Sequence, residues 1–101
     1  MIIRCRGNCR VRISYDSAKR TATLAERGLD FEDAADVFSD TTIDALDDRK
    51  NYGEARWQSF GRLRGRLVTI IWTPRGDVRH IISMRKANER EQAKYGRQLG
   101  S

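Results

Sequence analysis

The chain has 101 residues, a formal net charge of +6 and a pI of about 9.9. Apolar residues make up 39% and charged residues 34%, which allows one thin hydrophobic core and leaves too few residues for a second. No apolar run is longer than Ile70-Ile71-Trp72, so the sequence predicts neither a membrane-spanning helix nor a signal peptide. We expect a small, soluble, cytoplasmic domain.

The charge is divided unevenly along the chain. Residues 1–50 carry 9 basic and 10 acidic side chains, whereas residues 51–101 carry 11 basic and 4 acidic ones. A basic half attracts a polyanion, most often nucleic acid, although charged runs also simply coat a solvated surface. Because residues 26–48 hold nine carboxylates against the single Arg27, we expect a localised basic patch.

Cys5 and Cys9 lie close together near the start of the chain. A structural zinc site needs four ligands, and the only histidine that could join the two thiols is His80. We therefore expect no metal site and no cofactor. Residues 1–12 are predicted to form an N-terminal arm in front of one domain at 13–101.

The first half of the domain reads as one strand and two helices. A short strand at 13–15 precedes Asp16, which is placed to cap a helix that ends near Arg27 before Gly28. Asp30 caps a second helix whose apolar side chains recur at positions 31, 34, 35 and 38. Alanines in the stripes of both helices predict close packing against each other or against a sheet. Residues 39–53 read as a loop, with a brief strand at 42–46.

The second half changes to the pattern of strands. Branched and aromatic residues predict strands at 55–61, 66–73 and 78–84, joined by turns at 62–65 and 74–77. Asn88 and Glu91 then form a capping box for a final helix. The expected fold is α+β, with two N-terminal helices packed on an antiparallel sheet and a C-terminal helix.

Several stretches are familiar in their order and spacing. They are Tyr15-Asp16 with Lys19; Gly28-Leu29-Asp30-Phe31-Glu32-Asp33-Ala34-Ala35, Val37-Phe38 and Asp40; Glu54, Arg56 and Gly61; Gly65-Arg66-Leu67; Trp72-Thr73 and Arg75-Gly76-Asp77; Ile81-Ile82-Ser83, Arg85 and Ala87; and Glu91 and Tyr95. Together they resemble the BrnT family of type II toxins, small ribonucleases of RelE-like fold encoded beside a BrnA antitoxin. Two positions depart from the family's usual pattern: Arg27 stands in place of a histidine, and His80 in place of an arginine.

The resemblance implies a toxin that cleaves RNA without a metal and inhibits translation and growth. It also implies a ribbon-helix-helix antitoxin of the BrnA type, with two toxins held by an antitoxin dimer, operator DNA bound only through the antitoxin, and no membrane contact. We expect acidic and apolar antitoxin residues to lie against the basic half, and residues 16–38 to stay mostly outside the contact. Two alternatives remain: a nucleic-acid-binding or interaction module that has lost catalysis, and a metal-dependent nuclease.

Metal-free RNA cleavage needs a base, a cation for the phosphorane and an acid. The catalytic candidates are Arg85, Tyr95, His80 and Glu91, and the phosphate-binding candidates are Arg79, Arg66, Lys19 and Arg27. In a regular strand Arg79 and Arg85 share one face and His80 points to the other.

Most of these candidates also have a structural interpretation. Tyr95 is equally suited to packing the last helix, Glu91 is explained by the capping box, and Lys19 is suited to a solvated helix face. Trp57 and Trp72 read as core residues, although either ring could stack on an RNA base.

Overall fold

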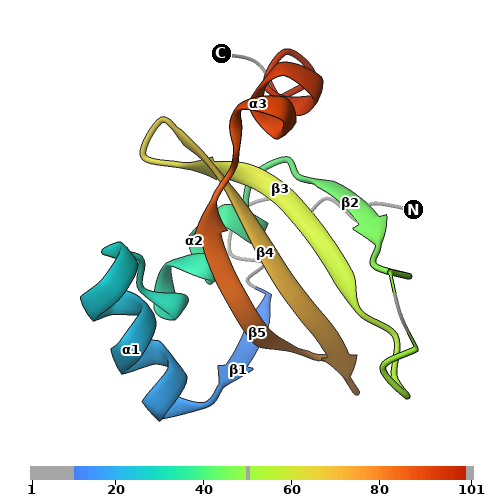
Figure 1. The fold of residues 1–101 in the computed structure, drawn as a ribbon. Helices are drawn as coiled ribbons and strands as arrows, with labels where there is room; N and C mark the ends of the chain where they lie inside the picture. Colours follow the sequence, from blue (N-terminus) through green and yellow to red (C-terminus); the bar gives the residue numbers. More distant parts are fainter. Residues whose placement is uncertain (1–10, 50, 100–101) are drawn as a thin grey trace.

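The structure is a computed structural model that describes residues 11–49 and 51–99. It is an α+β fold in which one sheet carries the helices around it (Figure 1). The expected arm is therefore described only at residues 11 and 12, and Cys5 and Cys9 lie outside the described residues. The elements are, in chain order, β1 (Arg12–Tyr15), α1 (Ser17–Arg27), the 3₁₀ helix η1 (Phe31–Asp33), α2 (Ala34–Phe38), β2 (Ile43–Leu46), β3 (Trp57–Leu63), β4 (Arg66–Arg75), β5 (Val78–Lys86) and α3 (Glu89–Tyr95).

The five strands form a mixed sheet in the order β1-β5-β4-β3-β2. Strands β2 to β5 pair with their neighbours in antiparallel fashion, as predicted for the second half of the chain. The expectation of a wholly antiparallel sheet is wrong for β1, which runs parallel to β5. A parallel neighbour needs a long connection, and here the helices and the other strands together supply it.

The predicted ends of α1 are confirmed. The Asp16 side chain accepts hydrogen bonds from the backbone N–H groups of Ala18 and Lys19 at 2.9 and 3.1 Å. Gly28 ends the helix in the left-handed conformation, with φ of 67°, where a glycine carries no steric penalty.

The expected alanine contact of α1 is wrong, because none of the helix's residues is buried. Polar groups hold α1 instead. Arg20 forms a two-bonded ion pair with Asp30, at 2.7 and 3.0 Å. Arg27 donates from Nη1 to the carbonyl oxygen of Met84 in β5 at 3.0 Å.

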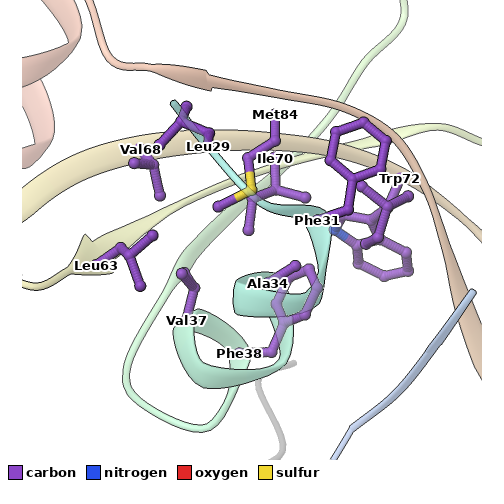
Figure 2. Packing of buried hydrophobic residues seen from close by; sticks show 11 residues of the cluster. Leu29, Phe31, Ala34, Val37, Phe38, Leu63, Val68, Ile70, Trp72 and Met84 are labelled. Atoms are coloured by element: carbon purple, nitrogen blue, oxygen red, sulfur yellow. The ribbon is translucent and has the colours of Figure 1, made fainter. Parts of the chain in front are cut away.

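The predicted second helix begins as a 3₁₀ turn, η1, and continues as α2. Its apolar stripe is buried as expected, with Phe31, Ala34 and Val37 fully inaccessible to solvent. Figure 2 shows the stripe facing Val68 and Ile70 of β4 across the core. We call this side of the sheet the helix face.

The other side, which we call the opposite face, has a smaller apolar cluster. Phe60 of β3 and Leu67 of β4 pack there with Ala87, and the ring of Tyr95 in α3 lies against them. Helix α3 therefore covers only the part of this face near the end of β5 (Figure 1). None of the helices in the described ranges is long and apolar enough to cross a membrane.

Candidate functional site

A β-bulge in β5 decides which side chains share a face. Trp72 of β4 pairs with Ile81, but the preceding Ile71 pairs with Ser83, so Ile82 is an extra residue in β5. One extra residue reverses the alternation of every side chain beyond it. His80 and Arg85 consequently lie together on the opposite face. The expectation from a regular strand, that Arg79 and Arg85 share a face, is wrong.

Arg85 is held by Glu91 at the start of α3. Its Nη1 and Nη2 donate to the two carboxylate oxygens of Glu91 at 2.7 and 2.8 Å. The same carboxylate accepts from the Asn88 backbone N–H at 3.0 Å, which completes the predicted capping box, and weakly from Thr69 Oγ1 at 3.4 Å. Glu91 therefore caps its helix and fixes the arginine at once.

The electrostatics of this pair keep both groups charged. The hydrogen bonds from Arg85 lower the pKa of Glu91, with burial opposing them. The Glu91 carboxylate in turn raises the pKa of Arg85. A guanidinium has five N–H donors in a rigid fork, so an arginine that spends two of them on Glu91 keeps others for an anion.

Tyr95 lies at the same end of the sheet but over a different strand. Its ring stacks on Phe60 of β3, with 4.2 Å between the centroids. Phe60 pairs with Thr69, which pairs with Arg85, so two strand spacings, about 10 Å, separate the backbones of Phe60 and Arg85. Packing is the contact that the structure gives this tyrosine.

His80 forms a second centre farther along β5. Its Nδ1 lies 2.9 Å from the hydroxyl oxygen of Ser14 in β1. Burial lowers the pKa of the imidazole, the positive charges of Arg75 and Lys19 lower it further, and the Glu54 carboxylate opposes them. The histidine is therefore neutral near pH 7, with Nε2 as the ring nitrogen left for a ligand.

The two centres are separated along the sheet. His80 pairs with Thr73 and Arg85 with Thr69. Four residues of β4 correspond to about 13 Å. The opposite face thus presents a fixed cation at one end and a neutral imidazole at the other.

Three of the phosphate-binding candidates lie away from Arg85. Arg79 is on the helix face, where its guanidinium lies over the ring of Trp72. Arg66 is exposed and pairs with Leu63, a residue of the helix-face core. Arg27 donates a hydrogen bond to the Met84 carbonyl oxygen at the edge of β5.

The fourth phosphate-binding candidate, Lys19, is exposed on α1. It lies near enough to His80 for its charge to act on that imidazole.

A family model described as a ribonuclease toxin, BrnT, of type II toxin-antitoxin systems matches residues 15–91. The chain belongs to this family. The match confirms the resemblance and spans the bulged strand, Arg85 and Glu91. No curated protein matches the chain.

The candidate site includes side chains that the sequence did not point to. Ser14 is one of them, and no local pattern could reveal it, because its contact depends on the parallel pairing of β1 with β5. The loop between β2 and β3 supplies another, Arg49, whose charge lowers the pKa of Arg85. Asp47 holds Arg49 through two bonds of 2.7 and 2.9 Å and is itself buried. The sequence signal that could have indicated Arg49 is the spacing of an acid and an arginine two residues apart, Asp47 and Arg49, within a predicted loop.

Within residues 11–49 and 51–99, no three His, Cys, Asp or Glu side chains form a group that could hold a metal ion. The chemistry that the described site offers is that of a guanidinium, a carboxylate, an imidazole and hydroxyl groups.

His80 is the only histidine, so an NMR titration of its imidazole reports one site. We expect a pKa below 6.5. Arg75→Gln should raise the pKa, because a positive charge that disfavours protonation is removed, and Glu54→Gln should lower it further. Because the pKa of His80 is lowered in the folded state, its neutral form contributes fully to the stability of the fold above pH 6.5. That contribution is lost as the pH falls below 6.5 and through the lowered pKa.

Arg64→Gln is the matched control. Arg64 pairs with Asp33 of η1, so its substitution should leave the His80 titration unchanged. A His80 pKa at or above 6.5 in the unaltered protein would contradict the environment described here.

Proposed function

We propose that this protein is a type II toxin that cleaves RNA on the opposite face of its sheet without a metal ion. The observation that carries the proposal is the two-bonded Arg85–Glu91 pair, at 2.7 and 2.8 Å, on the face that the bulge gives to His80 as well. The membership of the chain in a family of ribonuclease toxins supports it. The RelE-like arrangement implied by the resemblance belongs to the same proposal.

In the proposed mechanism Arg85 stabilises the charge of the phosphorane. A guanidinium that a carboxylate already holds in place loses less conformational entropy when the phosphate binds. Arg85 is therefore suited to act as a preorganised donor. Glu91 is the positioning residue for that fork. An anion that approaches Arg85 meets a side chain that is about one-third exposed.

Two residues are proposed to transfer protons, His80 as the base and Tyr95 as the acid. The neutral imidazole is suited to take the 2′-hydroxyl proton near pH 7, and Ser14 fixes the orientation of its ring. Tyr95 would give a proton to the departing 5′-oxygen.

The decisive experiment is a turnover assay on purified RNA with and without a chelator. The proposal expects shortened RNA in both samples. Cleavage that stops with the chelator would favour the metal-dependent alternative. RNA that is bound but never shortened would favour a binding module, a reading supported by Arg27, which replaces the family's histidine and is engaged by Met84.

Binding of RNA should be strongly salt dependent. Arg85, Arg49, Arg75 and Lys19 lie on or beside the opposite face, so we expect roughly three to five phosphate contacts. The logarithm of the affinity should then fall with log salt with a slope of about −2 to −3.5, at about −0.7 per contact on a single strand. Filter binding at several salt concentrations measures it. A slope near zero would mean that the positive charge is only a solvated coat.

The partner in this proposal is a BrnA-like ribbon-helix-helix antitoxin. Two toxins would be held by an antitoxin dimer that alone contacts operator DNA, and the toxin would act on translation in the cytoplasm. The family description, which names a type II toxin-antitoxin system, supports a partner of this kind. Acidic and apolar antitoxin residues are expected against the basic half, residues 62–95.

A further inference from the structure

A row of side chains crosses the helix face at the end of the sheet near the β4–β5 turn. Leu46 of the edge strand β2 pairs with Trp57, and Trp57 pairs with Trp72. The two indoles stack with 6.2 Å between their centroids and a 20° interplanar angle. Arg79 of β5 continues the row beyond Trp72. We call Leu46, Trp57, Trp72 and Arg79 the Arg79 shelf.

The guanidinium at the end of this shelf is placed on aromatic rings. Arg79 Cζ lies 4.3 Å from the centroid of the Trp72 ring and 4.6 Å from that of Phe38 in α2. Among the residues that the structure describes, Arg79 forms no hydrogen bond and no ion pair. Burial lowers the pKa of Arg79, and the charge of Asp44 opposes this effect.

A partly desolvated cation without an acceptor is a costly arrangement. Cation–π contacts compensate in part, and because Arg79 is half-buried its outer N–H donors meet solvent and no described protein acceptor. A carboxylate that arrives there would gain a charge-assisted, two-bonded contact. Arg79 is therefore a ready anchor for one anionic group.

The other end of the shelf is apolar and lies at a sheet edge. Leu46 is 55% exposed, so the row that begins at the two indoles ends in an apolar side chain that faces solvent. Among the strands of residues 11–49 and 51–99, β2 pairs only with β3, and an edge strand offers its outer backbone groups to another strand. An extended segment could pair with β2 and lay alternate side chains over Leu46 and Trp57.

The charge around the shelf selects between two kinds of occupant. Asp44 of β2 lies on the same face, and its charge acts on Arg79. Helix α2, which supplies Phe38 to the Arg79 guanidinium, also carries Asp36 and is followed by Asp40. A chain of phosphates would be repelled by these carboxylates, whereas a peptide can bring one carboxylate to Arg79 and basic or apolar groups elsewhere. The shelf therefore fits a protein partner better than RNA.

We propose that the Arg79 shelf docks an extended segment of the antitoxin, with an apolar side chain on Leu46 and Trp57 and a carboxylate on Arg79. This inference rests on the partner named in the proposed function, and is independent of RNA cleavage, because the shelf and the Arg85–Glu91 pair lie on different faces of the sheet.

The test uses the full-length toxin and, as the probe, the protein encoded by the reading frame adjacent to the toxin gene. Isothermal calorimetry should show that Arg79→Met weakens binding about 10- to 150-fold, as expected for the loss of a charged hydrogen-bonded contact of about 1.5–3 kcal/mol. Leu46→Asp, at an exposed position that folding tolerates, should weaken it at least tenfold. Amide exchange should slow at Ile43–Leu46 in the complex.

Two matched controls separate this surface from the rest of the molecule. Arg12→Met removes another exposed arginine, one outside both the shelf and residues 62–95, and should change the affinity less than threefold. Arg85→Ala should slow cleavage by about 10²–10³-fold and should also change the affinity for the antitoxin less than threefold. The thermal midpoint of each variant shows whether it is folded.

Several outcomes would overturn the inference. Affinities within threefold of the unaltered toxin for both Arg79→Met and Leu46→Asp would mean that the antitoxin binds elsewhere. Loss of RNA affinity in Arg79→Met would assign the shelf to RNA, and self-association of the free toxin that Leu46→Asp abolishes would assign it to a second copy. Failure of the adjacent-frame protein to bind at all would refute the docking and the antitoxin proposal, while cleavage by the free toxin would still stand.

Discussion

Replacing Arg85 by alanine should reduce RNA cleavage by about 10²–10³-fold, the usual effect of removing one preorganised transition-state donor. The reason is geometric, because Glu91 holds this guanidinium by two bonds on the face shared with His80. The variant should fold, since the Asn88–Glu91 capping box does not depend on the arginine. Single-turnover cleavage, growth arrest on induction and the thermal midpoint together measure these effects.

Three comparison variants show what the arginine supplies. Arg85→Lys keeps the charge but loses the two-pronged fork, so intermediate activity is expected. Glu91→Gln keeps an acceptor for the cap but loosens the ion pair, and should slow cleavage less than Arg85→Ala does. Arg66→Ala, on the helix face, should retain full activity. A folded and fully toxic Arg85→Ala variant would remove this residue from the mechanism.

Local patterns in the sequence predicted most of the secondary structure. The caps Asp16, Gly28 and Asn88 all lie where expected, because a cap depends on residues within one turn of the helix. The three predicted strands of the second half are present, with β3 beginning two residues later and β4 and β5 each ending two residues later than predicted. The brief strand expected at 42–46 is β2.

The contacts that depend on pairing between distant strands could not be predicted. The parallel partner of β1 is chosen by the whole fold, so the Ser14–His80 contact was not foreseen. The alanines of α1 formed a reasonable stripe, but α1 is held by Arg20 and Arg27, and the alanines face solvent.

The candidate site was predicted as a set of residue types more accurately than as a geometry. The capping role of Glu91 follows from its spacing to Asn88, whereas its ion pair with Arg85 is a contact that the structure adds. The bulge at Ile82 carries no sequence signature here, and it exchanges the faces of Arg79 and Arg85. A single extra residue thus moved one candidate out of the site and brought His80 into it.

Gly61→Ala should lower the free energy of unfolding by about 1–3 kcal/mol, the usual cost of forcing a methyl group into a packed core. Gly61 is buried in β3 on the helix face. A Cβ atom there would lie 2.6 Å from Val37 Cγ1 and 3.0 Å from Thr42 Cγ2. In a domain of this size each kcal/mol corresponds to about 4–8 °C in the thermal midpoint, so calorimetry resolves the effect.

The cause of that loss is tested by combining it with Val37→Ala. Val37 is fully buried, so its truncation alone should destabilise the fold, but it also removes the methyl group that the new Cβ would strike. The double variant should therefore lose less free energy of unfolding than the two single variants lose in total, by a coupling of about 1 kcal/mol. Strict additivity would show that the clash is relieved in another way. Because α2 and Arg85 lie on different faces of the sheet, the single variant should lose stability and keep its cleavage rate well below its melting temperature.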